Sequence, residues 1–397
     1  MFEHLQAYGG DPIFRLNEAF HADPRDRKVN LTIGLYYDDQ GRLPLLDVAR
    51  RAEEQWAAKG QPRGYLPIEG LASYRSAVQK LVFGADSKVL QEGRVATIQT
   101  LGGSGALKVG GDFLHEAYPN SEMWISDPAW DNHHSIFRGS GIPTHTYRYY
   151  DPATRGLDFT GLMEDISVLP EHSIVLLHPC CHNPTGADLS DEQWLQLIPV
   201  LQQRKLIPFL DMAYQGFGRS LDEDAFAVRA MVDAGLTFLL ANSFSKNFSY
   251  YSERCGGLSV VCQSADEADR VLGQLKAVVR RIYSNPPSHG GQAIATILSD
   301  ESLLAEWTAE VETMRQRIAA MRKRVHDRLK ELAPQYDSSY FVKQQGMFCY
   351  TGLTKEQIQK LRDDFGVYVL ESGRISVPGL NQSNVDYFAE SLAAVVA

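Results

Sequence analysis

Between residues 93 and 262, the sequence alternates short apolar runs with stretches of helical periodicity. Turn residues bound the runs, and each intervening stretch is long enough for a helix. The apolar runs cover residues 95–100, 123–126, 173–178, 207–210, 237–241 and 257–261. This alternation predicts βαβ units on a mainly parallel sheet with helices on its faces, and therefore an α/β fold.

A long helix and a group of short strands are expected after this region. Apolar residues from Trp307 to Val325 recur every three or four positions, which predicts a helix over 303–332 that packs across two domains, with a coiled coil as the alternative. Residues 347–353, 367–370 and 373–377 are expected to be strands of a smaller α+β domain, and residues 29–36 a strand outside the parallel sheet. We predict an N-terminal arm with part of the small domain over 1–45, a large domain over 46–312 and a small domain over 313–397.

Charge and apolar content narrow the class of protein. The net charge of −10 argues against a nucleic-acid partner or an anionic membrane surface, because both require a basic footprint. No apolar run reaches the length of about 18 residues that a transmembrane helix needs. The first residues also lack the basic and apolar regions of a signal peptide, so a cytoplasmic protein is expected.

The cysteines suit a reducing compartment. Five is an odd number, and Cys180 and Cys181 are adjacent, which is a poor disulfide framework. The segment from Cys180 to His182 can also be interpreted as a metal site. The sequence disfavours this interpretation, because no second Cys or His pair follows at metal-binding spacing.

Polar residues follow the predicted strands where the chain leaves the sheet, and ligands of open α/β sheets bind at such strand ends. A glycine-rich segment containing Gly103 and Ser104 follows the first run and precedes a helix, which suits an anion. Trp130 and His133 follow the second run and suggest a planar ligand. Taken singly, these features are also compatible with an ordinary turn and a core indole.

The next strand ends carry an amide, a carboxylate and an amine. Asn183 begins an Asn-Pro-Thr-Gly turn. Asp211 ends an apolar strand and should have a cationic partner, which a ligand pyridinium would provide. Lys246 lies between serines and phenylalanines, ahead of Arg254, and an amine in such surroundings loses its proton more easily. A surface lysine is the alternative.

The order of these motifs resembles the fold-type I pyridoxal-phosphate (PLP) enzymes, and specifically the aspartate/aromatic-amino-acid aminotransferase family. The segments Ser-Phe-Ser-Lys-Asn-Phe, His-Asn-Pro-Thr-Gly, Asp-Met-Ala-Tyr-Gln-Gly-Phe and Gly-Arg-Ile-Ser-Val carry the resemblance. It runs nearly end to end and is strongest to the bacterial aromatic-amino-acid (tyrosine) branch.

The resemblance implies a role for each site residue. Lys246 would hold PLP covalently and move the substrate proton, while Asp211, supported by His133, would pair with the ring nitrogen. Tyr214 and Asn183 would hydrogen-bond the ring oxygen, and Trp130 would stack on the ring. The phosphate would be held by Gly103, Ser104, Ser243 and Arg254, and by Tyr65 of a partner subunit.

The substrate residues implied by the resemblance define a shared site. Arg374 would bind the α-carboxylate, Gly34 would lie beside the substrate, and Arg280 would reach across from the partner subunit to a second carboxylate. Tyr65, Trp130 and Asn183 would also contact the substrate. The resemblance therefore implies a homodimer that acts on amino acids and 2-oxo acids.

The substrate preference depends on a few positions. Leu35, Tyr37 and Leu43 would border the side-chain pocket and favour an aromatic substrate, and Ser104 also follows the aromatic type. Against this, Gly64 departs from the leucine expected in aromatic enzymes, and Asn285 follows the aspartate type. Ile282 and Cys255 also vary from the commonest residues of the family. We expect aromatic amino acids to donate to 2-oxoglutarate with retained aspartate activity; the alternative is primarily an aspartate aminotransferase. A PLP lyase or decarboxylase, and a non-catalytic PLP-binding regulator, are disfavoured alternatives.

Overall fold

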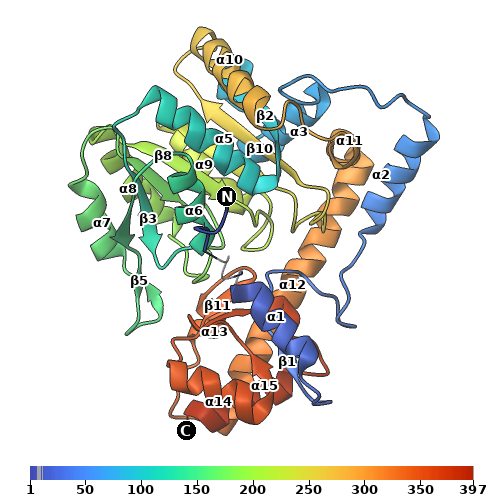
Figure 1. The fold of residues 1–397 in the computed structure, drawn as a ribbon, viewed down its shortest axis with the longest axis vertical. Helices are drawn as coiled ribbons and strands as arrows, with labels where there is room; N and C mark the ends of the chain where they lie inside the picture. Colours follow the sequence, from blue (N-terminus) through green and yellow to red (C-terminus); the bar gives the residue numbers. More distant parts are fainter. Residues whose placement is uncertain (7–9, 11, 397) are drawn as a thin grey trace.

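The computed structural model describes residues 1–6, 10 and 12–396. Its centre is a seven-stranded sheet in the order β2-β10-β9-β8-β7-β3-β4 (Figure 1). These strands are β2 (Val95–Leu101), β10 (Cys255–Val261), β9 (Phe238–Ser243), β8 (Ile207–Met212), β7 (Ile174–Leu177), β3 (Met123–Asp127) and β4 (Thr144–Arg148). Only β10 runs against the other strands of this sheet, which confirms the predicted mainly parallel α/β fold.

All six predicted apolar runs are strands of this sheet, and β4 is a further strand that the apolar pattern missed. Its sequence, Thr-His-Thr-Tyr-Arg, is largely polar, and only Tyr147 is buried. The strand lies at one edge and pairs on one side only, with β3. An edge strand needs little apolar surface, so the pattern of buried strands could not identify it.

Helices bury both faces of the sheet. Along β8, Phe209 belongs to one core cluster and Leu210 to another, because successive side chains point to opposite faces. The first cluster includes Leu107 of α5 (Gly102–Ala117) and Val278 of α10 (Ala265–Ile282). Trp194 of α8 (Asp191–Gln203) belongs to the second. Burial on both faces explains the continuous apolar runs.

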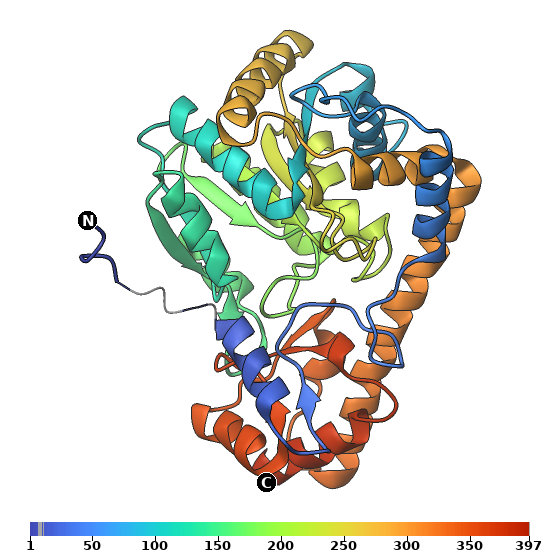
Figure 2. The same ribbon diagram turned by 45° about the vertical axis from the view of Figure 1, so that its right-hand side comes forward.

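The predicted long helix is α12 (Glu301–Leu332), which connects the sheet region to the C-terminal region (Figures 1 and 2). Asp300 caps its start by accepting hydrogen bonds from the amides of Ser302 and Leu303. Its apolar stripe, including Trp307 and Val325, is buried. The helix packs against α11 (His289–Ser299) and α15 (Val385–Val396), so it is a packed helix within this fold.

Segments from both ends of the chain meet below the sheet (Figure 2). Strand β1 (Val29–Asn30) pairs in parallel with β12 (Val367–Tyr368), and β11 (Phe348–Tyr350) pairs with β13 (Arg374–Ser376). The expected strand over 29–36 is only two residues long, because beyond Asn30 the chain turns toward the cavity described below. The domain boundaries at 46 and 313 stay a prediction.

The remaining elements complete the framework. The helices are α1 (Pro12–Ala22), α2 (Asp47–Ala58), α3 (Ala72–Phe83), α4 (Lys88–Gln91), α6 (Asp131–Gly139), α7 (Phe159–Ser167), α9 (Phe226–Asp233), α13 (Tyr340–Lys343) and α14 (Lys355–Phe365). A small hairpin joins β5 (Tyr150–Asp151) to β6 (Gly156–Leu157), and two 3₁₀ turns cover Glu223–Ala225 and Val377–Gly379. Among the described residues, no helix has the length and apolar character required to span a bilayer.

Candidate active site

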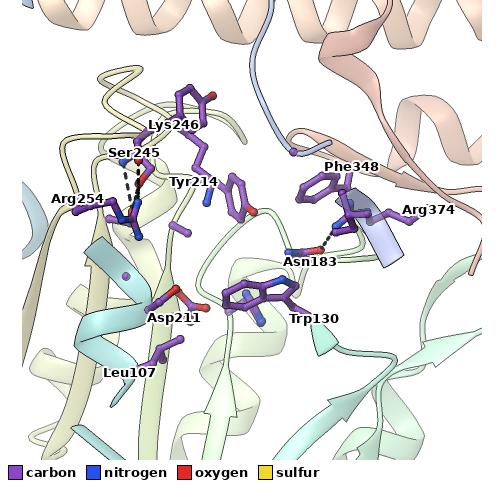
Figure 3. Close-up of a pocket in the computed structure, with 18 residues that line it drawn as sticks. Leu107, Trp130, Asn183, Asp211, Tyr214, Ser245, Lys246, Arg254, Phe348 and Arg374 are labelled. Atoms are coloured by element: carbon purple, nitrogen blue, oxygen red, sulfur yellow. Dashed lines mark hydrogen bonds between the residues drawn. The ribbon is translucent and has the colours of Figure 1, made fainter. Parts of the chain in front are cut away.

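A cavity of about 270 Å³ lies where several strands of the sheet end (Figure 3). The residues that line it come from the segments after β2, β3, β7, β8 and β9, and from both terminal regions of the chain. Those predicted from the sequence are Gly34, Gly103, Ser104, Trp130, Asn183, Asp211, Tyr214, Ser243, Lys246, Arg254 and Arg374. Residues far apart in the sequence therefore meet at one strand-end cavity, as expected for an α/β sheet.

Lys246 extends into this cavity from the segment after β9 (Figure 3). Its Nζ lies 4.6 Å from the centre of the Tyr214 ring. Removal from solvent lowers the pKa of Lys246 to about 8; the carboxylate of Asp211 opposes this shift, and Arg254 and Arg374 add to it. The amine is therefore available as a nucleophile near neutral pH.

The lowered pKa can be measured on the cofactor-free protein. Labelling of Lys246 by an amine-reactive reagent should reach half its maximal rate near pH 8, because only the neutral amine reacts. An ordinary lysine has a pKa of about 10.4. Peptide mass spectrometry across a pH series would give the midpoint, and a midpoint above about pH 10 would contradict the described environment.

Asp211 lies at the end of β8 as a buried carboxylate with a hydrogen-bonding partner, and the cationic partner expected from its position stays a prediction. Its Oδ2 lies 2.8 Å from Nε2 of His133. Burial opposes ionisation, but the hydrogen bond from His133, with the nearby Lys246, lowers the net pKa of Asp211. The carboxylate stays charged at the edge of the cavity and can pair with a protonated ring nitrogen.

His178 lies behind this pair and was not singled out from the sequence. Its ring centre lies 5.3 Å from that of His133, and its side chain is buried. Burial lowers the pKa of His178 to about 4, so the ring is neutral and adds no charge near Asp211. Its position directly after β7 was the available signal, because the same argument identified Asp211 at the end of β8.

A cluster of donors forms one end of the cavity. Nη1 of Arg254 donates to Oγ of Ser245 at 3.2 Å, and Oγ of Ser243 donates to the same oxygen at 3.2 Å. The first turn of α5, with Gly103 and Ser104, faces this cluster and presents free backbone amides. A guanidinium, several hydroxyls and a helix N-terminus together suit a phosphate group.

Gly102 makes this cluster possible, although the sequence argument emphasised its neighbours. It has a φ of +66°, and a Cβ built there would lie 2.6 Å from Nη2 of Arg254. A side chain would therefore displace the guanidinium as well as strain the backbone.

We expect Gly102→Ala to weaken cofactor binding by at least about tenfold and to destabilise the fold by about 1–3 kcal/mol. Gly60→Ala is the matched control, because Gly60 also has a positive φ (+57°) but a Cβ there would have no neighbour within 4 Å. Cofactor titration and thermal unfolding of both variants separate backbone strain from the contact with Arg254. Equal cofactor affinity in the two variants would argue against the contact.

Arg374, on β13, lies across the cavity from Arg254 (Figure 3). Its Nη2 donates to the carbonyl of Thr32 at 2.8 Å, and Nη1 donates to Oδ1 of Asn183 at 3.4 Å. Its guanidinium carbon also lies 4.2 Å from the centre of the Phe348 ring. These contacts hold a buried arginine in one orientation, in which it can bind a carboxylate.

Phe348 closes this wall and was missed by the sequence analysis. A Cβ at Gly34 would approach its ring to 2.9 Å, so the glycine allows the N-terminal segment to pass closely. Tyr251 was also missed; its hydroxyl accepts a hydrogen bond from the amide of Tyr36 at 2.7 Å. The other residues that line the cavity and were not predicted are His178, described above, and Ile13, Leu107, Ala213 and Ser245.

Three predicted site residues do not line the cavity of their own chain: His133, which lies behind Asp211, and Tyr65 and Arg280. Tyr65 is 95% exposed, and Arg280, at the end of α10, is exposed and hydrogen-bonds Ser284. Leu43, expected to border the side-chain pocket, is also exposed, and Leu35 and Tyr37 are partly buried near Gly34.

The donor set fits pyridoxal phosphate. A lysine amine of lowered pKa suits its aldehyde, the buried carboxylate of Asp211 suits its ring nitrogen, and the cluster around Arg254 suits its phosphate. All three groups border one cavity.

Comparison with known proteins gives consistent matches over the whole chain. The family model "Aminotransferase class I and II" matches residues 26–392. The sequence is 55% identical to the aromatic-amino-acid aminotransferase of Escherichia coli K12 and 47% identical to an aspartate aminotransferase of Pseudomonas aeruginosa, each over 100% of both chains. The crystal structure of an aromatic-amino-acid aminotransferase from Burkholderia pseudomallei, covalently bound to pyridoxal phosphate, has a TM-score of 0.99 at 48% identity and covers 100% of both chains.

Proposed function

Since the chain belongs to the class I and II aminotransferase family, we propose that it transfers the amino group of tyrosine, phenylalanine and tryptophan to 2-oxoglutarate. We propose that it uses pyridoxal phosphate and also accepts aspartate. The observation that carries the proposal is the single cavity that joins Lys246, Asp211 and Arg254 to Arg374. It provides an amine, a counter-charge, an anion site and a carboxylate site together.

The residues around the cofactor site have complementary tasks in this proposal. When bound, pyridoxal phosphate supplies an aldehyde for the amino group and an electron-withdrawing ring. Lys246 holds the cofactor and, once displaced by substrate, moves the proton at the substrate Cα. Asp211, oriented by His133, keeps the ring nitrogen protonated. The ring oxygen would accept hydrogen bonds from Tyr214 and Asn183, Trp130 would cover one ring face, and the phosphate would be held by Gly103, Ser104, Ser243 and Arg254.

The substrate would lie between Lys246 and Arg374. Arg374 would bind the α-carboxylate through its planar fork of donors, and its contacts with Thr32 and Asn183 fix that fork in place. Gly34, which packs against Phe348, would lie beside the substrate, since both residues line the cavity. These contacts orient the Cα–H bond toward the amine, which is the main requirement of the proton transfer.

A second subunit would complete the site. We propose a homodimer in which Tyr65 contacts the phosphate and Arg280 binds the side-chain carboxylate of aspartate or glutamate. The exposure of both side chains, away from the cavity of their own chain, supports this assignment. We also propose a cytoplasmic location, which the five free cysteines support.

The preference for aromatic substrates rests on the side-chain pocket and on the relatives. Leu35 and Tyr37 are partly buried on the segment of Gly34, which lines the cavity, and they would provide apolar surface near the substrate. The E. coli relative is named an aromatic-amino-acid aminotransferase. The relative from P. aeruginosa is named an aspartate aminotransferase, and primary aspartate activity is therefore the second candidate.

A panel of amino donors tests the proposal. Tyrosine, phenylalanine, tryptophan and aspartate are each mixed with 2-oxoglutarate, and keto acid and glutamate are quantified together. Equal amounts of both products are expected, with kcat/KM higher for the aromatic donors. Release of ammonia or of an amine would indicate a lyase or decarboxylase, and higher kcat/KM for aspartate would favour the second candidate.

The role of Arg280 can be tested by changing it to alanine. Arg280→Ala should raise KM for aspartate and glutamate by about 10–100-fold, because charge-assisted hydrogen bonds to the second carboxylate are lost. Phenylalanine, which has no such group, should be little affected. Arg281→Ala is the control, since Arg281 is the next residue on α10 and forms an ion pair with Glu116. Equal losses on all substrates would contradict the role.

A further inference from the structure

Two adjacent thiols, Cys180 and Cys181, have no part in the proposed reaction. Both are free and buried, in the segment that follows β7 and precedes Asn183. Successive side chains of an extended chain point to opposite sides. Cys181 instead has a φ of +54°, and the two sulfur atoms lie within 4.8 Å of each other.

A carboxylate from a different segment joins the two thiols. The sulfur atoms of Cys180 and Cys181 and a carboxylate oxygen of Asp224 all lie within 4.8 Å of one another. Donor atoms of a tetrahedral zinc site lie about 3.5–4 Å apart, at metal–sulfur distances of about 2.3 Å. Small side-chain rotations would therefore bring these three atoms around one ion. The sequence showed no second pair of ligands for this motif, and the tertiary structure supplies a carboxylate from a remote segment, while both ring nitrogens of His182 form hydrogen bonds elsewhere.

Asp224 retains the capacity to bind an ion. Its Oδ2 accepts hydrogen bonds from the amides of Gly216 and Gly218, and Oδ1 accepts one from Arg219. A carboxylate offers about four acceptor positions, so one position on Oδ1 remains. The three amides also hold the carboxylate in place, which reduces the entropy that ordering a ligand would cost.

The surroundings carry negative charge that no side chain neutralises directly. Asp188 is buried nearby, where its carboxylate accepts the amides of Cys181 and His182. Neither Asp188 nor Asp224 forms an ion pair with any residue that the structure describes. The adjacent arginines are engaged elsewhere: Arg219 pairs with Asp191, and Arg322 donates to backbone carbonyls. Buried carboxylates without a counter-ion favour binding of a cation.

A separate cavity gives access to Cys180 and Asp224, two of the three donors. It has a volume of about 350 Å³ and is lined by Cys180, Asp188 and Asp224, together with Trp194, Arg219 and Gln345. This volume admits an ion with a coordinating water as its fourth ligand. None of these residues lines the active-site cavity, which meets the other side of the same segment at Asn183.

We propose that Cys180, Cys181 and Asp224 form a binding site for one thiophilic divalent cation, of the class of zinc or cadmium. Two sulfur ligands and one carboxylate select such ions over magnesium or calcium, which prefer oxygen. Binding forms two metal–sulfur bonds and releases the two thiol protons to solvent.

Cadmium binding to the PLP-loaded enzyme tests the site. The holoenzyme is used because His133, His178 and Asp211 also converge, and that cluster belongs to the active site. Equilibrium dialysis should give one tightly bound cadmium per chain, with a cadmium–thiolate absorbance band. Cys180→Ser and Cys181→Ser should each weaken binding by at least about tenfold. Cys262→Ser is the control, because Cys262 is another buried free cysteine; this variant should bind cadmium with the same affinity as the unchanged enzyme.

A measurement on the unchanged sequence covers the case in which a serine variant does not fold. X-ray absorption at the cadmium edge should show two sulfur neighbours and additional oxygen neighbours. Absence of a tight ion, a sulfur-free coordination shell, or unchanged affinity in both serine variants would each overturn the proposal. These outcomes are independent of transamination, so the site and the proposed function can fail separately.

Discussion

Replacing Lys246 by alanine should reduce turnover by at least about a thousandfold. The variant loses the amine that holds the cofactor and the base that moves the substrate proton, and general acid–base catalysis alone contributes about 10²–10⁴-fold. The fold should persist, because Lys246 extends into a cavity and a smaller side chain leaves no buried group unpaired. Steady-state kinetics and the absorbance of the lysine-bound cofactor would measure both losses.

Covalent trapping makes the test specific. Borohydride reduction of the unchanged enzyme should fix the cofactor mass on the peptide that contains Lys246, and the alanine variant should carry no such label. Lys323→Ala is the control, because Lys323 is an exposed lysine on α12 that pairs with Asp327. Near-normal half-reaction rates in Lys246→Ala, or a label on another lysine, would refute the assignment.

Replacing Asp211 by asparagine should have the second largest effect, a loss of about a thousandfold in kcat, or roughly 4 kcal/mol. The carboxylate is the only acidic group that lines the cavity, within the described residues. An amide cannot keep a ring nitrogen protonated, and it also leaves His133 without its charged partner. Substrate binding at Arg374 should change much less, so kcat should fall more than KM rises.

A second substitution separates the effect of the negative charge of Asp211 on kcat from the effect of its structural role. Asp211→Glu retains the carboxylate and should recover part of the lost kcat, whereas a purely structural role would leave both variants equally impaired. Asp165→Asn is the control, because that carboxylate pairs with Arg148 away from the cavity. Activity of Asp211→Asn within about tenfold of the unchanged enzyme would contradict the proposed role.

Much of the cofactor side of the site could be predicted without coordinates. Asp211, Lys246 and Asn183 each follow an apolar run, and parallel strands bring their carboxyl ends to one edge of a sheet. The same runs predicted six strands of the central sheet. The polar edge strand β4 was missed because it buries only Tyr147.

The sequence by itself determined which chemical groups occur and at which strand ends, because local apolar periodicity specifies strands and parallel pairing aligns their ends. Only the tertiary structure decided which groups from remote segments approach these strand ends. Phe348, on strand β11, reaches Arg374 and Gly34, and Asp224, in a 3₁₀ turn, reaches the paired cysteines, and the positions of both elements depend on packing across the whole core. Local patterns carry no information about such contacts, since they depend on how separate elements pack together.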